Sequence, residues 1–300
     1  MMQRPQQRDG NRAPTSGITG QFRRGSQAMN TFPVSDKWER GSPYEQYIGR
    51  WSRQVAPLFL AWLDQAPGRR WADVGCGTGA LSAAILERCA PGDVVGVEPS
   101  AGFLALASKG LGNRARFLAG SAAALPLRDG SFDVVVSGLV LNFVPDVRAA
   151  LAEMARVVAP GGTIAAYVWD YADGMEVIRH FWDAAVTLDR AAAALHEGAR
   201  FPLCNPTGLR QAFELAGLKS VDVAALDLAA EFVDFDEYWR PFLGGQGPAP
   251  AYVGSLPEER RAALRELLRQ RLQGSRGGPM TLRARAWAVR GALLQSASEP

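Results

Sequence analysis

The sequence predicts an α/β fold with a doubly wound, mostly parallel, seven-stranded sheet and inserted helices that form a lid. From about residue 53, short apolar runs alternate with longer helical stretches, as in βαβ units with right-handed crossovers. Several of these runs are almost continuously apolar, which suits strands buried on both faces of a parallel sheet. A glycine-rich turn also joins the first run to the helix after it.

The first half of the pattern contains five expected strands, at residues 70–74, 93–98, 115–120, 132–138 and 162–169. The helices between them are expected at 79–89, 100–110 and 146–158. In the last helix the apolar residues recur at helical spacing and share one face. The stretch Pro160-Gly161-Gly162 then ends that helix and turns the chain into the next strand.

After Trp169 the rhythm changes, because residues 170–200 favour extra helices. Residues 205–218 predict a helix capped by Asn205, and 220–228 predict a strand. Helices are then expected at 234–243 and 257–272, before a final alternating strand at 281–291. We find no internal repeat. We therefore expect one domain over 31–300, with lid helices at 42–62, a core at 70–170 and helical inserts at 170–204 and 234–273.

Charge and composition limit the possible partners. The net charge of +3 comes from the Arg-rich residues 1–30, which carry +4 by themselves and leave about −1 for the rest. Those residues have little to bury and predict a disordered basic tail. The near-neutral body disfavours nucleic-acid binding, and no apolar run is long enough to span a membrane. Three scattered cysteines suit a reducing, cytoplasmic location and not a disulfide or zinc framework.

The stretch WADVGCGTG, from Trp71 to Gly79, places three glycines between a strand and a helix. Such a turn lets a ligand lie against backbone N–H groups at a helix N-terminus. Its spacing, G-x-G-x-G, differs from the dinucleotide fingerprint G-x-G-x-x-G. Glu98 ends the next expected strand, 23 residues after Gly75. A carboxylate at this position can accept hydrogen bonds from the two hydroxyls of an adenosine ribose.

In chain order, WADVGCGTG, VVGVEPS, AGSAAALPLRDGSFDVVVSGLVLNFVPD and VVAPGGTI resemble the motifs of class I S-adenosylmethionine-dependent methyltransferases. The similarity is to the small-molecule branch that includes the quinone methyltransferases, and it covers about residues 70–170. The resemblance implies a Rossmann-like methyltransferase fold and S-adenosylmethionine as cofactor.

The resemblance also implies residue roles. Asp73 matches an acid near the methionine portion, Glu98 the ribose acid, and Gly138 a backbone contact to the methionine amino group. The other implied cofactor contacts are Gly75, Cys76, Gly77, Thr78, Gly79, Pro99, Ser100, Ser121 and Ala122. Cys76 favours a packing role over a nucleophilic one, since no activating partner is evident. Ser121 departs from the Asp or Asn usual there and predicts a somewhat weaker adenine contact.

Three segments are expected to reach the acceptor. The segment 42–53 resembles a lid, in which Tyr44 and Tyr47 would cover the substrate and Arg50 would bind the cofactor carboxylate. Alternatively, this segment is a helix whose aromatic side chains pack on the sheet. Asn142 either faces the acceptor or caps the following helix. Trp169 and Tyr171 are further substrate candidates. If a general base exists, His180 or Asp170 is the candidate, and no carboxylate cluster suits a metal.

The sequence thus predicts an enzyme that transfers a methyl group from S-adenosylmethionine to a small organic acceptor and releases S-adenosylhomocysteine. Three alternatives stay open: a tRNA or rRNA methyltransferase, a non-catalytic S-adenosylmethionine-binding protein, and a nicotinamide oxidoreductase, which the glycine spacing disfavours. The expected assembly is a monomer or a homodimer.

Overall fold

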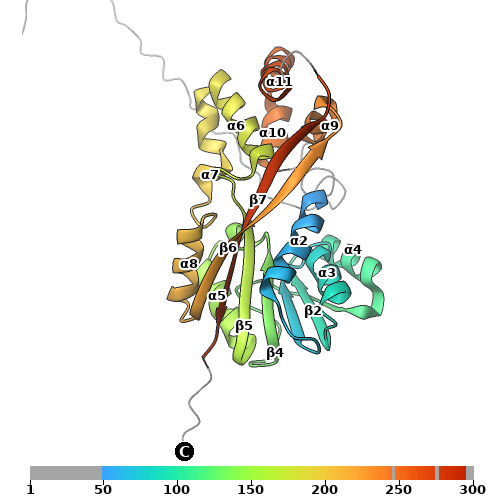
Figure 1. Ribbon diagram of the computed structural model, residues 1–300, viewed down its shortest axis with the longest axis vertical. Helices are drawn as coiled ribbons and strands as arrows, with labels where there is room; N and C mark the ends of the chain where they lie inside the picture. The colour runs from blue at the N-terminus through green and yellow to red at the C-terminus, as the bar shows by residue number, and fades with distance from the viewer. Residues whose placement is uncertain (1–48, 245–246, 274–276, 295–300) are drawn as a thin grey trace, which may run out of the picture. The chain divides into compact units, whose positions relative to one another are not determined.

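Seven strands form one sheet in the order β3-β2-β1-β4-β5-β7-β6 (Figure 1). They are β1 (Arg70–Val74), β2 (Asp93–Glu98), β3 (Arg116–Ala119), β4 (Phe132–Gly138), β5 (Val158–Trp169), β6 (Lys219–Phe232) and β7 (Met280–Ala292). The first five pair in parallel, and β7 runs antiparallel to both β5 and β6. The predicted mostly parallel, seven-stranded sheet is confirmed.

This computed structural model describes residues 49–244, 247–273 and 277–294, all of which fall within one compact unit of the chain. The predicted basic tail at 1–30 and the first part of the predicted lid, with Tyr44 and Tyr47, lie outside the described residues.

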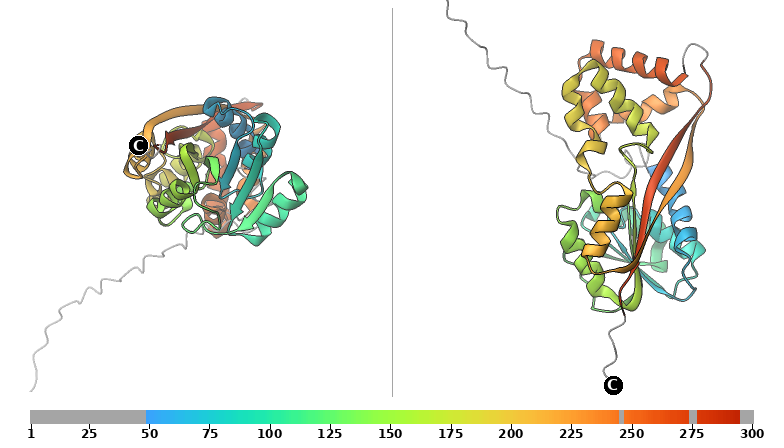
Figure 2. Two further views of the ribbon diagram at one scale, coloured as in Figure 1. Left: turned by 90° about the horizontal axis from the view of Figure 1, so that it is seen from below. Right: turned by 60° about the vertical axis from the view of Figure 1, so that its left-hand side comes forward.

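Helices cover both faces of the sheet (Figures 1 and 2). On one face lie α2 (Arg50–Leu63), α3 (Ala80–Arg88) and α4 (Ala101–Leu111), the last followed by a short 3-10 turn, η2 (Gly112–Arg114). On the other lie α5 (Val147–Val157) and α8 (Pro206–Leu215). In α2 the residues Trp51, Val55, Phe59 and Leu63 recur every four positions and are buried, so this helix packs on the sheet by an apolar stripe.

The remaining helices gather beyond the carboxyl ends of the first five strands, and we call them the helical cap (Figure 1). The cap comprises α6 (Glu176–Leu188), η4 (Arg190–Leu195), α7 (Glu197–Arg200), α9 (Phe235–Trp239), η5 (Arg240–Gly244), α10 (Pro248–Ser255) and α11 (Glu258–Gln273). Phe181 stacks on Phe242 with ring centroids 4.6 Å apart, and Trp182 lies against Tyr252. These aromatic side chains form the interior of the cap.

Two expectations for the cap helices were wrong in detail. The single helix expected at 234–243 ends at Trp239 and continues as a 3-10 turn, because Pro241 lacks the N–H that an α-helix needs at that position. Helix α10 was not expected, since its segment is rich in proline and glycine. It forms because Pro248 and Pro250 lie in its first turn, where proline costs no hydrogen bond.

The strand order reverses at β1, which lies between β2 and β4. In open α/β sheets a crevice forms at such a point, outside the carboxyl ends of the strands. Here the turn after β1 leads into α3, and a short 3-10 turn, η3 (Leu141–Phe143), follows β4. The topology therefore places the glycine turn, Glu98 and Gly138 around one crevice.

Candidate functional site

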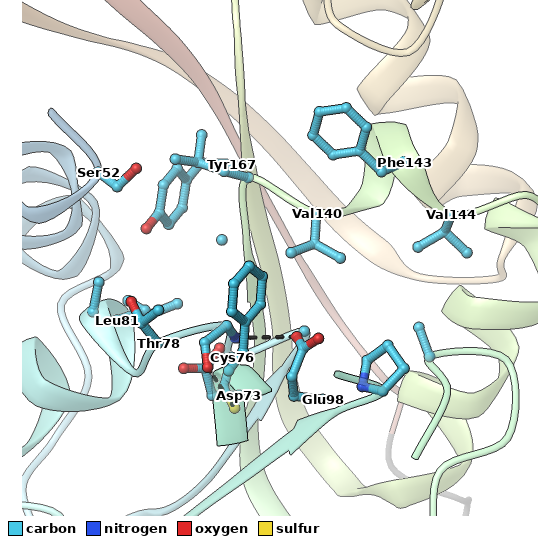
Figure 3. Close-up of a pocket in the computed structure, with 18 of the residues that line it drawn as sticks. Ser52, Asp73, Cys76, Thr78, Leu81, Glu98, Val140, Phe143, Val144 and Tyr167 are labelled. Carbon is cyan, nitrogen blue, oxygen red and sulfur yellow. Dashed lines mark hydrogen bonds between the residues drawn. The ribbon is translucent and has the colours of Figure 1, made fainter. Parts of the chain in front are cut away.

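A cavity of about 320 Å³ occupies this crevice (Figure 3). The carboxyl ends of β1, β2, β4 and β5 and the turns after them supply most of its wall, and the segment after β3 adds Ser121 and Ala122. Helix α2 adds Ser52, and the start of α3 adds Ala80 and Leu81. The predicted residues that line the cavity are Asp73, Gly75, Cys76, Gly77, Thr78, Glu98, Pro99, Ser121, Ala122, Gly138, Trp169 and Tyr171.

The glycine turn has a backbone that only glycine adopts at low cost. Gly75, Gly77 and Gly79 all have positive φ values, of 74°, 53° and 88°. A side chain on Gly75 would also collide with Val140, because its Cβ would lie 2.5 Å from a methyl carbon there. At Gly77 the space that a Cβ would occupy is open. The turn therefore brings bare backbone to the cavity wall.

Glu98 is held beside this turn at the end of β2. One of its carboxylate oxygens accepts a hydrogen bond from the Gly77 N–H at 3.1 Å, and the other accepts one from the Ser100 N–H at 3.0 Å. Burial raises the pKa of Glu98, while the two N–H groups oppose that rise. Each oxygen keeps a second lone pair for a ligand hydroxyl, so the carboxylate suits a diol.

Asp73 lies deeper, on β1, and only 1% of it is exposed. One carboxylate oxygen, Oδ2, accepts a hydrogen bond from the Ser82 hydroxyl at 2.7 Å. The other, Oδ1, is buried at the cavity with no hydrogen-bond partner among the described residues. Burial raises the pKa of Asp73 to about 7. A buried acceptor of this kind is costly unless a ligand donor or cation meets it.

Cys76 packs against β2. A Cβ on Gly96 would lie 2.8 Å from the Cys76 sulfur, so the thiol fills the space that this glycine leaves. Burial, with the nearby carboxylates Asp73 and Glu98, raises the pKa of the thiol far above its usual value. A protonated, buried thiol is a poor nucleophile, which supports the packing role over the catalytic one.

The cavity wall is polar at one end and apolar at the other. Beside Glu98, the wall is formed by Pro99, Phe103, Ser121 and Ala122, and the Ser121 hydroxyl accepts a hydrogen bond from the Ala123 N–H at 3.3 Å. Beyond Gly138 the wall is formed by Leu139, Val140, Phe143, Val144, Pro145, Trp169 and Tyr171. Figure 3 shows Val140, Phe143 and Val144 on the side of the cavity opposite Ser52 and Leu81.

Several predicted site residues do not line the cavity. Gly79 is the N-cap of α3. Asn142 lies in η3 and, like Asp170 and His180, is not part of the cavity wall. Buried Asp170 accepts a hydrogen bond from the Asp173 N–H in the loop before α6, and half-buried His180 lies on α6 with its pKa lowered by burial.

Arg50 is also not among the residues that line the cavity. Its guanidinium forms an ion pair with Glu237 of α9 at 2.7 Å and lies 4.6 Å and 4.7 Å from the ring centroids of Trp51 and Phe232. The predicted contact with a cofactor carboxylate therefore has a competing partner in this structure.

Sequence reasoning missed about half of the wall. The missed residues are Ser52, Ala80, Leu81, Phe103, Leu139, Val140, Phe143, Val144, Pro145 and Tyr167. The apolar stretch after β4 is present in the sequence as LVLNFVP, but the prediction named only its one polar residue, Asn142. No sequence pattern marks Tyr167 as a cavity residue, because its position in the wall depends on the pairing of β5 with Gly138 of β4.

In the described part of the chain, no helix is long and apolar enough to cross a bilayer. In the same residues, no group of three or more His, Cys, Asp or Glu side chains gathers where a metal ion would fit.

Comparison with known families matches residues 72–166 to a model described as a methyltransferase domain. A demethylmenaquinone methyltransferase from Thermus thermophilus is 37% identical over 118 residues, which is 38% of this chain and 52% of that protein. The chain thus matches about half the length of this relative.

Solved structures share the fold at low sequence identity. The YcgJ protein from Bacillus subtilis has a TM-score of 0.52 and 16% identity, over 81% of this chain and 99% of that one. A phosphoethanolamine N-methyltransferase from Haemonchus contortus, solved with phosphomonomethylethanolamine and S-adenosylhomocysteine, also has a TM-score of 0.52 and 16% identity. That match covers 85% of this chain and 57% of the other.

Proposed function

We infer that the chain belongs, through residues 72–166, to the class I S-adenosylmethionine-dependent methyltransferase family, and we propose that it methylates a small organic molecule. S-adenosylhomocysteine would be the second product. One observation carries the proposal: a single cavity joins the buried, unpaired oxygen of Asp73, the bare glycine turn and the capped carboxylate of Glu98.

The residues of this cavity fit the cofactor. Glu98 suits the ribose hydroxyls, and Asp73 suits the positively charged amino group of the methionine portion. Pro99, Ser121 and Ala122 would flank the adenine, and the open space at Gly77 leaves room for the ligand against the backbone. When bound, S-adenosylmethionine supplies an electrophilic methyl group on a positively charged sulfur.

The chain's own contribution to the reaction is positioning and exclusion of water. Neither His180 nor Asp170 lines the cavity, so the base role predicted for them gains no support from its wall. We therefore propose that the apolar wall beyond Gly138 holds the acceptor atom in line with the methyl group. An uncharged O–H or C–H acceptor gives up a proton when it is methylated, and because no residue of the wall is assigned as a base, that proton would pass to solvent water.

The wall also bears on the class of acceptor. Asp73 and Glu98 are the only charged side chains among the described residues that line the cavity, and both are assigned to the cofactor. The acceptor end offers aliphatic and aromatic surface instead. We propose an uncharged, aromatic or quinone-like acceptor, in keeping with the name of the demethylmenaquinone methyltransferase relative.

Calorimetric titration with S-adenosylhomocysteine, with NADH as the control, tests the cofactor assignment. Binding of S-adenosylhomocysteine alone is expected. Binding of neither ligand, or of NADH alone, would overturn the proposal.

A second experiment tests the acceptor class. It compares the rate of S-adenosylhomocysteine release in the presence of hydroquinones and phenols with the rate in the presence of ethanolamine phosphate and glycine. Faster turnover with a charged amine would contradict an uncharged acceptor, and binding without turnover on any acceptor would favour a non-catalytic binding protein.

The last part of the proposal concerns the extent of the domain, its cellular location and its oligomeric state. We propose one methyltransferase domain over 31–300, acting in the cytoplasm as a monomer or homodimer. The free cysteines Cys76, Cys89 and Cys204 support a reducing location. Sedimentation of the full chain at several concentrations would test the assembly, since a larger oligomer would contradict it.

A further inference from the structure

Residues 120–131, which join β3 to β4, form turns and not a helix or a regular strand, and we call them the β3–β4 loop. Ser121 and Ala122, near its start, line the cavity in which Glu98 lies. The proposed function places these two residues against the adenine of the cofactor. The position of this part of the wall therefore depends on what holds the loop.

The start of the β3–β4 loop is joined to the sheet and to the part of the loop that follows. The Gly120 N–H donates to the Glu98 carbonyl at 3.3 Å. The Ala124 N–H donates to the Ser121 carbonyl at 3.0 Å and closes a tight turn. Pro126 folds back over this start, because a Cβ on Gly120 would lie 2.6 Å from a carbon of the proline ring. The cavity wall is thus coupled to the middle of the loop.

Two side chains of α5, Glu153 and Arg156, hold the middle of the loop, and we call them the α5 clamp. The Leu125 N–H donates to Oε2 of Glu153 at 2.7 Å. Arg156 donates to the carbonyl oxygens of Leu125 and Leu127 at 3.0 Å and 2.9 Å. It also donates to the carboxylate of Asp129 at 2.6 Å. The clamp therefore binds both backbone groups of Leu125 and two further points of the loop.

The clamp is itself a bidentate ion pair. Nε and Nη2 of Arg156 donate to the two carboxylate oxygens of Glu153, each at 2.7 Å. Arg156 thus makes five hydrogen bonds, as many as a guanidinium has N–H groups. This pairing lowers the pKa of Glu153 and raises that of Arg156, so both side chains stay charged. Neither side chain lines the cavity, so any effect on the cofactor must pass through the loop.

We infer that the α5 clamp sets the affinity for the adenine end of the cofactor by holding the β3–β4 loop in its binding conformation. This inference rests on the proposed function, because it assigns two positioning residues to the same cofactor site. Ordering a loop when a ligand binds costs conformational entropy and weakens the affinity. A loop that the clamp has already ordered avoids this cost. Glu153 and Arg156 are thus positioning residues that act through Ser121 and Ala122.

The test compares two ligands on Arg156→Met, which keeps an apolar stem and removes all the N–H donors. The ligands are S-adenosylhomocysteine and S-ribosylhomocysteine, which keeps the ribose and the amino acid but lacks the adenine. We expect the variant to bind S-adenosylhomocysteine roughly tenfold more weakly than the unaltered protein, as measured by calorimetry. The affinity for S-ribosylhomocysteine should change less than twofold. Equal losses for both ligands, or no loss for either, would overturn the inference.

Arg70→Met is the matched control. Arg70 also forms a bidentate ion pair, with Asp133 at 3.2 Å and 2.9 Å, but it joins the amino ends of β1 and β4, at the opposite end of the strands from the cavity. We expect this variant to lose stability and keep its affinity for S-adenosylhomocysteine. A tenfold loss in Arg70→Met as well would show a general effect of destabilisation and overturn the inference.

A second variant keeps the test open if Arg156→Met does not fold. Arg156→Lys keeps the positive charge, but its single ammonium group cannot bind the same set of acceptors, so it carries the same two-ligand comparison. If the unaltered protein binds S-adenosylhomocysteine and the folded Arg156 variant binds it equally well, this inference alone fails. If the unaltered protein does not bind S-adenosylhomocysteine, the proposed function fails as well.

Discussion

Two buried carboxylates in one cavity have different surroundings and therefore different tasks. Glu98 is capped by two backbone N–H groups, which partly offset the cost of burying its charge. Asp73 has one hydroxyl partner and one bare oxygen, so its charge is poorly compensated until a ligand arrives. At the scale of single residues, these surroundings support the proposed roles, in which Glu98 binds a neutral diol and Asp73 binds a cation.

Glu98→Ala is expected to weaken S-adenosylhomocysteine binding by about 1.5–3 kcal/mol, because charge-assisted hydrogen bonds to the ribose would be lost. Calorimetry would measure the change, and circular dichroism would check that the variant is folded. Glu259→Ala, an exposed change on α11, is the control and should bind as tightly as the unaltered protein. An unchanged affinity in folded Glu98→Ala would show that the ribose lies elsewhere.

Asp73 makes the stability of the ligand-free protein depend on pH. Its folded pKa of about 7 lies above the ordinary value of 3.8, so between these limits the folded state holds a proton that the unfolded state has released. Stability should therefore fall as the pH rises from about 4 to 7. Asp73→Asn removes this penalty and should raise the free energy of unfolding at pH 8 by about 2–4 kcal/mol. Urea titrations of both proteins at pH 5 and pH 8 would measure it, and an Asn variant that is less stable at pH 8 would contradict the assignment.

At the scale of elements, α2 joins the sheet to the helical cap. Its apolar stripe packs on the sheet, Ser52 reaches the cavity, and Arg50 at its first turn pairs with Glu237 of α9. Glu237 also accepts a hydrogen bond from the Val233 N–H at 2.7 Å, and the pairing with Arg50 and this N–H together lower its pKa. The start of α2 is thus tied to a segment nearly two hundred residues away in sequence.

Arg50→Gln tests whether this ion pair is structural. Because both partners are about one-third exposed, we expect the variant to lose only about 0.5–2 kcal/mol of stability, including its contacts with the two rings. The affinity for S-adenosylhomocysteine should stay within twofold. Thermal unfolding and calorimetry would measure the two quantities. A tenfold loss of affinity would instead support the contact between Arg50 and the cofactor carboxylate that the sequence predicts.

The limits of sequence reasoning appear at the same scale. The glycine turn and Glu98 could be placed because their roles depend on local order: strand, turn, helix, strand. The positions of Tyr167 and Arg50 depend on partners distant in the chain, Gly138 and Glu237, which no local pattern reveals. The break at Pro241, in contrast, follows from a local rule, because proline has no N–H to donate within an α-helix.

At the scale of the whole molecule, the sheet and the cap share one hydrophobic core among the described residues. Buried side chains from α2 and β4, such as Phe59 and Val135, belong to the same cluster as Phe181 and Phe242 of the cap. The long antiparallel pair of β6 and β7 runs from the sheet to the cap (Figure 2). A continuous core of this kind favours cooperative unfolding.

Phe181→Ala should therefore destabilise the whole described unit and not the cap alone. Its ring is fully buried and stacked on Phe242, so the loss is expected to be about 3–5 kcal/mol. Far-ultraviolet circular dichroism and tryptophan fluorescence should report one coincident transition, since tryptophans lie both in the sheet, at Trp71, and in the cap, at Trp182. Two separated transitions would show that the cap unfolds independently.

The position of β7 has a consequence for synthesis on the ribosome. This strand follows every other strand in the chain, yet it lies between β5 and β6 and pairs with both. Until residues 280–292 have emerged, β6 has no strand partner and β5 presents an open edge. A nascent chain stalled before residue 280 would carry one unpaired strand and one open sheet edge, which are the kind of surface that chaperones bind and that aggregates recruit. Translation must pass that point before the sheet can close.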